Sequence, residues 1–529
     1  MIESEYSKKG MVVAPHRLAA EIGRDVLREG GNAIEAMVAA AAAIAVAYPH
    51  MNGIGGDCFW LISKGGEAPV GIDACGAAAR LATRDYYARK QLPAIPARGP
   101  DAALTVAGAV SGWQEALAIS GTWGGRMPLS RLLQPAIVLA RNGVPVTQSL
   151  FRNTREKLPE LRDVPGFAET FLVGGAPPEP GTPLPLPKLA ETLEHLAREG
   201  LADFYTGGLA SSLASNLEAA GSPLRLADFE HHRARRVAPL SLRLKGATAY
   251  NMPPPTQGLA SLMILGIFER LKPPHADDFA YVHTLVEAAK QAFMVRDAHV
   301  TDPAHMDCDP AAFLSDSFLD ECAGAIDPAK ALPWPRPAPA GDTVWLGAID
   351  AQGNAVSFIQ SLYWEFGSGL VLPDSGILWQ NRGTSFSLEA QALQSLEPGR
   401  KPFHTIQPPL AIFDDGRIMP YGTMGGEGQP QTQSMIYTRH VHYGQSLAEA
   451  IDAPRWLLGR TWGADKTNLR IENRFAPEVI DALIRAGHDV ELVGPYEEVM
   501  GHAGALVRDG AGDIEGASDP RSDGSAAGC

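Results

Sequence analysis

Cysteine is scarce in this sequence, and its five residues are widely separated, with no Cys-x-x-Cys pair among them. An odd number of dispersed cysteines supplies neither a disulfide framework nor a thiolate zinc site, and it indicates a reducing compartment. The five residues are Cys58, Cys75, Cys308, Cys322 and Cys529.

The sequence also lacks a hydrophobic run long enough to cross a bilayer. The longest apolar stretch, residues 36–48, is alanine-rich and falls short of the roughly 20 residues that a membrane-spanning helix needs. Gly30-Gly31-Asn32 precede this stretch and Pro49 follows it, so we expect a buried helix. The first residues, MIESEYSKKGMVVAPH, do not have the basic-then-apolar order of a secretion signal. We therefore expect a cytoplasmic protein.

Positive charge is in deficit, with 45 Lys and Arg against 60 Asp and Glu and a net charge of −15. This balance argues against nucleic acid or an acidic membrane surface as a general partner, because no basic excess is available to neutralise phosphates. The remaining composition, 45% hydrophobic and 20% charged, is typical of a globular protein.

The signatures of phosphate-binding loops, zinc proteases and serine hydrolases (GxxxxGK[ST], HExxH and GxSxG) are absent. The 14 histidines are not combined with carboxylates at the spacing of helical metal ligands, so surface or packing roles are favoured. The turn Asn52-Gly-Ile-Gly-Gly-Asp57 has the glycines of an anion-binding loop, but a lone glycine cluster favours a tight structural turn. We expect no metal and no organic cofactor.

Glycine and proline are abundant, with 55 and 42 residues, and they divide the chain. Before residue 325, apolar residues at helical spacing predict helices. These are expected at Arg17–Arg28, Ala33–Tyr48, Leu129–Asn142, Leu189–Leu196 and Asp278–Arg296. The segment 327–341 contains four prolines between positions 333 and 339, which predicts an extended linker because proline interrupts both helices and central strands.

After the linker the pattern becomes that of short strands. Two β-prone runs, Val344–Ile349 and Ala355–Ser361, flank a turn at residues 350–354 and predict a hairpin. Further strands are expected at Gly376–Trp379, Leu410–Phe413 and Arg417–Tyr421, a second hairpin at Ala505–Arg508 and Ile514–Ala517, and helices at Gln431–Tyr443, Ser446–Ala453 and Pro477–Ala486. This order predicts an α+β fold in which two stacked antiparallel sheets lie between helical layers.

The strongest local signal is Gly341-Asp342-Thr343, where the linker meets the first strand. Taken alone, a threonine at this place is most simply the first residue of a strand. The other interpretation is that Thr343 attacks the bond that joins it to Asp342, through an N-to-O acyl shift, and becomes a new N-terminus. Its hydroxyl is then the nucleophile, and its α-amine, with an ordinary pKa of about 7.7 to 8.0, is the general base.

A set of ordered motifs favours that second interpretation. From Thr343 onward they are TVWLGAIDAQGNAVSFIQSLYWEFGSG, GILWQN, RKPFHTIQP, MGGEG and GASDPRSDG, and before it AAEIGRDVLREGGNAIEAMVAA, NGIGGD, ATRDYY, VAGAVSGW and QPAIVLARNG. With these motifs, which span nearly the whole chain, the sequence resembles the γ-glutamyltransferase family of N-terminal-nucleophile hydrolases. The resemblance implies an αββα sandwich and self-cleavage into a helix-rich large chain (1–342) and a small chain (343–529). The two chains are expected to associate as one composite domain, and further homo-oligomerisation stays open.

The resemblance also implies roles for individual residues. Thr343 matches the family nucleophile, and Ser361 stands where the family has a hydroxyl that holds and polarises it. Gly425 and Gly426 match the backbone pair whose N–H groups form the oxyanion hole. The other interpretation of this glycine pair is a tight turn after a strand.

The substrate pocket departs from the glutamyl-specific members of the family. Cys75 stands in place of the arginine that holds the substrate α-carboxylate, and Ser385 in place of the aspartate that holds the α-amine. His404-Thr405 replaces a pair of serines, and Tyr363 replaces an asparagine. Because an ammonium group without a carboxylate partner is costly to bury, we expect γ-glutamyl compounds to be poor substrates.

Arg382 stands where glutamyl enzymes have a glutamine beside the pocket. Its planar guanidinium suits a carboxylate ligand. The other residues expected to line this pocket are Asn381, Ser385, His404, Thr405 and Tyr363. The alternatives for Arg382 are an exposed loop residue and a structural ion pair with Glu365.

These features predict hydrolysis of a small amide whose carboxylate lies close to the scissile carbonyl. Within the family the sequence most resembles the oxamate amidohydrolase branch, which implies conversion of oxamate and water to oxalate and ammonia in purine catabolism. Two alternatives stay open. One is a glutathione hydrolase or γ-glutamyl transferase, and the other is an uncleaved, non-catalytic homologue that keeps the fold.

Overall fold

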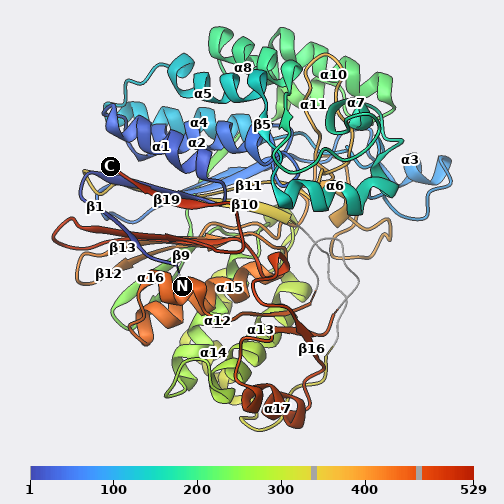
Figure 1. Ribbon diagram of the computed structural model, residues 1–529. Coiled ribbons are helices and arrows are strands. Elements are labelled where there is room, and N and C mark those ends of the chain that lie inside the picture. The colour runs from blue at the N-terminus through green and yellow to red at the C-terminus, as the bar shows by residue number, and fades with distance from the viewer. Residues whose placement is uncertain (1, 335–341, 460–466) are drawn as a thin grey trace.

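The computed structural model of the protein describes residues 2–334, 342–459 and 467–529. Two seven-stranded sheets are stacked on each other, with one layer of helices above them and another below (Figure 1). Neighbouring strands within both sheets run antiparallel. This four-layer arrangement confirms the predicted α+β class and the αββα sandwich.

The strand order of the upper sheet is β19-β2-β10-β11-β3-β4-β7, and that of the lower sheet is β1-β18-β17-β13-β12-β9-β8. The upper strands are β2 (Gly10–Ala14), β3 (Asp57–Ser63), β4 (Val70–Ala74), β7 (Arg235–Val237), β10 (Asp342–Asp350), β11 (Ala355–Tyr363) and β19 (Ser525–Gly528). The lower strands are β1 (Glu5–Ser7), β8 (Leu240–Leu244), β9 (Ala247–Asn251), β12 (Leu410–Phe413), β13 (Ile418–Thr423), β17 (Ala503–Arg508) and β18 (Ile514–Ser518). Two smaller sheets contain β14 (Trp456–Leu458), β15 (Leu469–Glu472) and β16 (Val490–Val493), and β5 (Val144–Pro145) with β6 (Pro183–Leu184).

Strands from before and after residue 342 lie side by side in both large sheets. The hairpin β10–β11 is inserted between β2 and β3, while in the lower sheet β12 pairs with β9 and β18 pairs with β1. A cut at residue 342 would therefore leave two segments that share both sheets and the apolar core between them.

Helices from the first part of the chain cover the upper sheet (Figure 1). The longer ones are α1 (Arg17–Arg28), α2 (Ala33–Ala47), α4 (Ala109–Thr122), α5 (Leu129–Asn142), α6 (Gln148–Leu161), α8 (Pro187–Glu199) and α10 (Gly208–Ala220). The shorter ones are α3 (Arg84–Arg89), α7 (Phe167–Phe171), α9 (Asp203–Thr206) and α11 (Leu226–His231). As expected, α2 is buried along its whole length, and a capping box between Asn32 and Glu35 begins it. Its small alanine side chains let it pack closely on α1, α5 and β10.

The lower sheet is covered by helices that come from both parts of the chain. They are α12 (Gly258–Leu271), α13 (Phe279–His299), α14 (Asp316–Gly324), α15 (Gly428–Tyr437), α16 (Leu447–Asp452) and α17 (Pro477–Ala486). The predicted helix at 431–443 corresponds to α15 and a π-helical turn, Thr438–His442, that continues it. Within the described part of the chain, no helix combines the length and the apolarity needed to cross a bilayer.

Most predicted elements are found where the sequence places them. Both predicted hairpins, β10–β11 and β17–β18, are confirmed, and α1, α5, α17 and β12 have the predicted bounds. The strand predicted at Gly376–Trp379 is wrong. Gly376 has a φ of 66° and turns the chain, so that Leu378 and Trp379 make only isolated bridges, to Val371 and Gly55.

The predicted linker is only partly described. Residues 335–341 lie outside the described residues, and residues 327–334 are in neither a helix nor a strand. The helix-rich prediction for the first part of the chain also misses several strands, among them β3. Every residue of β3 is buried, so its sequence DCFWLIS does not show the alternation of a strand with one exposed face.

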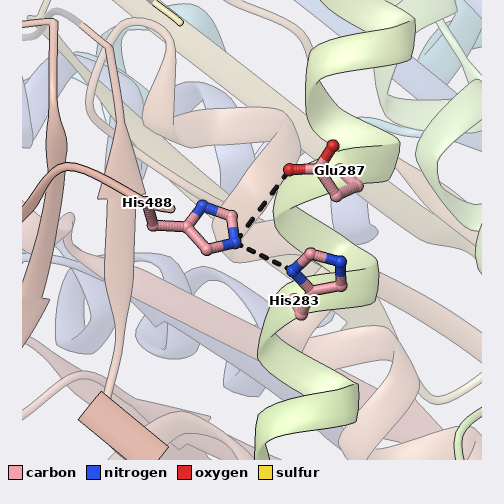
Figure 2. A group of neighbouring side chains, drawn as sticks. All are labelled: His283, Glu287 and His488. Carbon is pink, nitrogen blue, oxygen red and sulfur yellow. Dashed lines mark hydrogen bonds and ion pairs between the residues drawn. The ribbon is translucent and has the colours of Figure 1, made fainter. Parts of the chain in front are cut away.

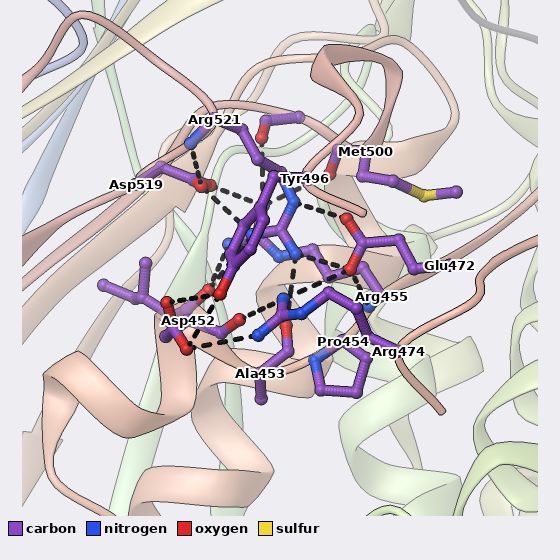
Figure 3. A network of polar contacts seen from close by, with 12 residues as sticks. Asp452, Ala453, Pro454, Arg455, Glu472, Arg474, Tyr496, Met500, Asp519 and Arg521 are labelled. Carbon is purple, nitrogen blue, oxygen red and sulfur yellow. Dashed lines mark hydrogen bonds and ion pairs between the residues drawn. The ribbon is translucent and has the colours of Figure 1, made fainter. Parts of the chain in front are cut away.

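A buried ionic network ties the C-terminal motif GASDPRSDG to the three-stranded sheet (Figure 3). The Arg521 guanidinium contacts both Glu472 oxygens, from Nε to Oε1 at 2.7 Å and from NH2 to Oε2 at 2.6 Å. Its NH1 donates to Asp519 Oδ1 at 3.1 Å, and Arg455 NH1 lies 2.5 Å from Asp519 Oδ2. Because all four side chains are fully buried, loss of one partner would leave an uncompensated charge in the interior.

Candidate active site

Thr343 and Ser361 face each other across the β10–β11 hairpin. The Thr343 hydroxyl donates to Ser361 Oγ at 3.2 Å, and the same Oγ accepts the backbone N–H of Tyr363 at 2.8 Å. The register of the two strands shifts between Asp342 and Val344, so Thr343 sits at a β-bulge. Bulges redirect side chains and are common beside active sites. The predicted nucleophile and its predicted partner are thus hydrogen-bonded and buried.

The glycine turn before β3 lies against this hairpin. A Cβ added to Gly56 would be 2.1 Å from the Ser361 carbonyl oxygen, and one added to Gly55 would be 2.2 Å from the Leu378 carbonyl oxygen. Only glycine allows backbones to approach so closely. Close packing therefore accounts for these glycines, in line with the structural-turn interpretation, and it fixes the position of Ser361.

Gly425 and Gly426 form the turn between β13 and α15. Their φ values of 102° and 29° are both in the region that favours glycine. The Gly426 carbonyl accepts a hydrogen bond from Gln257 Nε2 at 2.8 Å, and the same amide donates to the Thr405 carbonyl at 2.6 Å. Gln257 thereby links the glycine pair to the predicted pocket residue Thr405.

A buried arginine holds this glutamine in place. Arg296 of α13 donates from NH1 to Gln257 Oε1 at 3.0 Å and from NH2 to Glu427 Oε1 at 2.6 Å. Its guanidinium carbon also lies 4.0 Å from the centre of the Phe293 ring. The sequence prediction includes neither Gln257, Arg296 nor Glu427 as a site residue, because three separate segments bring them together and no spacing signals their contact.

Arg382 is fully buried beside Tyr363. Its guanidinium carbon is 3.8 Å from the centre of the Tyr363 ring, and none of its three nitrogens has a hydrogen-bond partner among the described residues. Burial lowers the pKa of Arg382 to about 10, so the side chain stays charged at neutral pH. The predicted alternatives do not apply, because Arg382 is not exposed and Glu365 instead lies 3.7 Å from Lys157 Nζ.

Other buried polar atoms near Arg382 are also without hydrogen-bond partners in the described part of the chain. They are both ring nitrogens of His404 and the side-chain oxygens Thr405 Oγ1, Ser385 Oγ, Gln380 Oε1 and Asp57 Oδ2. Buried polar groups are nearly always hydrogen-bonded in folded proteins. Arg382 is thus one of several buried polar groups in this region that have no hydrogen-bond partner among the described residues.

Asp57 is a buried carboxyl near Arg382 that the sequence prediction does not include, although it ends the glycine motif. Its Oδ1 accepts the N–H groups of Gly76 and Gly108 at 3.1 Å and 3.0 Å, while its Oδ2 lies 3.7 Å from His404 Nε2. Burial raises the pKa of Asp57 to about 7, although the nearby Arg382 opposes this shift.

Asn381 and Cys75 are tied to the surrounding protein. The Asn381 amide donates to the Ala97 carbonyl at 3.0 Å, and its oxygen accepts the N–H of Trp364 at 3.1 Å. Cys75 Sγ donates to Asp73 Oδ1 at 3.0 Å, and burial raises the pKa of the thiol well above its usual range. Cys75 is therefore a neutral group at the place where the resemblance implies an arginine.

Among the described residues, two groups each bring together three side chains of the kinds that bind metal ions. One is partly exposed and consists of His299, Asp307 and Cys308, with 3.9 Å between His299 Nδ1 and Cys308 Sγ. The other is buried and consists of His283, Glu287 and His488 (Figure 2). Neither group includes a residue of the Thr343 site.

The hydrogen bonds of the buried group assign it a structural role. His283 Nε2 donates to the Asp327 carbonyl at 2.8 Å, so its Nδ1 is the acceptor for His488 Nε2 at 2.9 Å. Lys290 Nζ lies 2.7 Å from Glu287 Oε1 and already balances that carboxylate. This group thus anchors the chain around Asp327, and its donors are in use without a metal ion.

Comparison with known proteins places this site in context. The family model described as gamma-glutamyltranspeptidase matches residues 19–529. Over the full length of both chains, the protein is 56% identical to the oxamate amidohydrolase proenzyme of Klebsiella pneumoniae and 41% identical to the glutathione hydrolase-like YwrD proenzyme of Bacillus subtilis. The crystal structure of cephalosporin acylase from Bacillus halodurans superposes with a TM-score of 0.92 at 33% identity and covers 100% of this chain and 97% of that one. The chain belongs to the gamma-glutamyltranspeptidase family.

Proposed function

We propose that this protein is a self-processing amidohydrolase that converts oxamate and water to oxalate and ammonia. The observation that carries the proposal is the buried, unpartnered guanidinium of Arg382. The full-length similarity to an oxamate amidohydrolase proenzyme supports the same assignment. A cytoplasmic location and a place in purine catabolism are parts of this proposal.

Processing is the first reaction that we propose. The Thr343 hydroxyl attacks the carbonyl carbon of Asp342, and the peptide C–N bond breaks as an ester to Oγ1 forms. The hydroxyl proton passes to the departing nitrogen, which becomes the free α-amine of Thr343. One water molecule then hydrolyses the ester, which leaves an α-carboxylate on Asp342 and frees the hydroxyl of Thr343. Ser361, hydrogen-bonded to Thr343 Oγ1, holds the hydroxyl in place during the attack. Residues 1–342 and 343–529 become the large and small chains.

Hydrolysis of the substrate uses the new N-terminus. The α-amine takes the proton of the Thr343 hydroxyl as Oγ1 attacks the amide carbonyl, and it returns a proton to the departing nitrogen, which leaves as ammonia. The N–H groups of Gly425 and Gly426 stabilise the negative charge on the tetrahedral intermediate. Water then hydrolyses the ester on Thr343 and releases oxalate.

Three contacts link the proposed carboxylate site to the nucleophile. Arg382 stacks on Tyr363, the N–H of Tyr363 bonds Ser361, and Ser361 bonds Thr343. A substrate held by Arg382 and attacked by Thr343 must therefore have its carboxylate close to its amide, as oxamate does. We assign Ser385, His404 and Thr405 as further polar contacts for this carboxylate, and Asn381 as a residue that positions the loops.

The second candidate, a glutathione hydrolase or γ-glutamyl transferase, is favoured by the names of other relatives and by the description of the family model. The pocket offers the neutral groups Cys75 and Ser385 where a γ-glutamyl head group needs charged partners. Ammonia release from oxamate should exceed turnover of glutathione by about 100-fold in kcat/KM, the scale of losing one buried charge contact. Faster turnover of glutathione would overturn the pocket assignment.

The third candidate, an uncleaved non-catalytic homologue, is tested on a denaturing gel. Two fragments are expected in place of a single band at 56.2 kDa. A single band together with no ammonia release from any small amide would favour the non-catalytic alternative.

A further inference from the structure

The partly exposed group at the end of α13 combines three kinds of metal ligand, and we call it the His-Asp-Cys group. It consists of the imidazole of His299, the carboxylate of Asp307 and the thiol of Cys308. One ligand atom from each residue lies within 4.8 Å of the other two. The proposed reaction uses none of these three side chains.

The spacing of the ligand atoms fits a tetrahedral zinc ion. His299 Nδ1 lies 3.9 Å from Cys308 Sγ. With zinc bonds of about 2.0 Å to nitrogen and about 2.3 Å to sulfur, tetrahedral coordination sets two such atoms about 3.5 Å apart. A small change of side-chain torsion brings them to that separation. Asp307 is exposed, so its carboxylate can rotate toward the same ion.

The composition of the group favours zinc over magnesium or calcium. A thiolate is a soft ligand that suits zinc, whereas magnesium and calcium prefer oxygen ligands alone. One thiolate and one carboxylate together balance the two positive charges of the ion, and imidazole binds it as a neutral ligand. Because the group is partly exposed, water can reach the fourth tetrahedral position.

Two short 3₁₀ helices hold the loop that carries the thiol and the carboxylate. They are η1 (Pro303–His305) and η2 (Pro310–Leu314). Each begins at an aspartate, Asp302 or Asp309, whose side chain accepts a backbone N–H of that helix. The loop is therefore fixed at both ends, and less ordering is needed when its side chains bind an ion.

The histidine of the group is held from the other side. His299 is the last residue of α13, and its ring packs on the Phe313 ring with 4.9 Å between their centres. In this orientation Nδ1 faces Cys308. Packing within the protein thus places the imidazole, as a preorganised metal site requires.

The buried group of His283, Glu287 and His488 is a weaker candidate, although it also offers three ligands (Figure 2). Lys290 lies 2.7 Å from Glu287 Oε1 and already balances that carboxylate. Asp307, in contrast, forms no ion pair with a residue that the structure describes. A cation would therefore gain more at the His-Asp-Cys group than at the buried one.

We propose that the His-Asp-Cys group binds one zinc ion, which joins the end of α13 to the loop between η1 and η2. The ion stabilises the folded chain, because the three ligands come together only there. Arg296, one turn before His299 on α13, donates to Gln257 and Glu427, so the ion braces the helix that supports the proposed oxyanion turn. This inference does not depend on the identity of the substrate.

Metal binding to the full processed protein tests the proposal. After treatment with a chelator, the parent should bind one zinc ion per chain at micromolar zinc in a calorimetric titration. Its melting temperature should rise with zinc, and magnesium should not have this effect. Cobalt(II), which accepts the same ligands, should give the near-ultraviolet absorption band of a bound thiolate.

Matched pairs of variants locate the ion. Cys308→Ser and His299→Gln each remove one ligand and should weaken zinc binding by about 100-fold, because even a group that only orients a ligand is worth about 10- to 100-fold. Cys529→Ser removes another partly buried cysteine, and His305→Gln removes a nearby histidine outside the group. Both control variants should bind zinc as the parent does.

Two outcomes would overturn the proposal. One is the lack of zinc binding by the parent at micromolar zinc. The other is zinc binding that survives in Cys308→Ser and is lost in His488→Gln, which would place the ion in the buried group. Neither measurement uses oxamate, so failure of the proposed function and failure of the zinc site are distinguished.

Discussion

Arg382 and Tyr363 form a buried stack in which the guanidinium carbon lies 3.8 Å from the centre of the phenol ring. Tyr363 has a φ of 85°, a left-handed conformation that is strained for an aromatic residue, by about 1 kcal/mol or more. In that conformation its N–H bonds Ser361 Oγ while its ring supports the guanidinium. One strained residue thus sets the separation between the proposed nucleophile and the cation that we assign to the substrate.

Replacing Arg382 tests whether this arginine binds the substrate or stabilises the fold. Arg382→Met removes a buried charge that has no hydrogen-bond partner among the described residues, so the melting temperature should stay unchanged or rise. The kcat/KM for oxamate should fall by about 100- to 1,000-fold, or about 3 to 4 kcal/mol, because the substrate carboxylate loses its counterion. Thermal unfolding and ammonia release measure the two effects.

Arg521→Met is the matched control for this experiment. It also removes a fully buried guanidinium, but this one contacts Glu472 and Asp519 (Figure 3). Removing this shared partner from the two buried carboxylates should cost about 3 to 5 kcal/mol of unfolding free energy. Equal destabilisation by the two substitutions would contradict the assignment of Arg382 to the substrate.

Thr343→Ala removes both proposed nucleophilic steps. The variant should migrate as one band of 56.2 kDa and should release no ammonia, whereas Thr343→Ser keeps a hydroxyl and should still be processed. Gel electrophoresis and N-terminal sequencing of the small chain provide the measurement. A cleaved Thr343→Ala protein would place the cut at another bond.

Gln257→Leu tests whether the Gln257 amide is needed to hold Gly425 and Gly426 in position. Without the amide, the Gly426 carbonyl and Arg296 NH1 lose their partner, so the proposed oxyanion donors are held less firmly. We expect kcat to fall by about 10-fold with KM nearly unchanged, a smaller loss than that of removing an oxyanion donor outright.

Gln433→Leu is the control. It removes another buried glutamine, one that bonds Ser261 and Gln407, and it should lower stability without this selective loss of kcat. A parallel rise in KM would argue against a role in positioning the oxyanion donors.

We expect Asp57 to make the site depend on pH near neutrality. Its pKa of about 7 in the folded protein lies above the ordinary value of about 3.9, so its contribution to stability is present at low pH and is lost between about pH 4 and 7. Asp57→Asn keeps an oxygen for the Gly76 and Gly108 N–H groups and should flatten the stability profile over that range. KM for an anionic amide should rise above pH 7 in the parent, as Asp57 ionises, and should not rise in the variant. If KM still rises above pH 7 in Asp57→Asn, the rise comes from the ionisation of another group.

The sequence pattern predicts the parts of the site that local chain features determine. The β10–β11 hairpin follows from its turn, and the resemblance to a family identifies Thr343 and Ser361 on it. Arg382 could be located as a candidate, but its burial without a partner depends on loops that the sequence pattern does not place. The link from Gln257 through Arg296 to Glu427 has no local signal in the sequence, because it joins the residue before α12, helix α13 and the turn before α15. Contacts between segments that are far apart in the sequence could be identified only from the structure.

Gly56 tests how strictly the site depends on backbone packing. A Cβ at Gly56 would be 2.1 Å from the Ser361 carbonyl oxygen, so Gly56→Ala must displace β11 or the turn itself. We expect a loss of about 1 to 3 kcal/mol of unfolding free energy, the range for overpacking. Processing before Thr343 should also slow, since Ser361 carries the hydroxyl that Thr343 contacts. Gly53→Ala is the control, because a Cβ there would meet Leu362 at an ordinary distance of 3.7 Å. Gly53→Ala should leave both stability and processing unchanged. If the two substitutions destabilise the protein equally, any side chain added to this turn is harmful, and the close contact with Ser361 is not the cause.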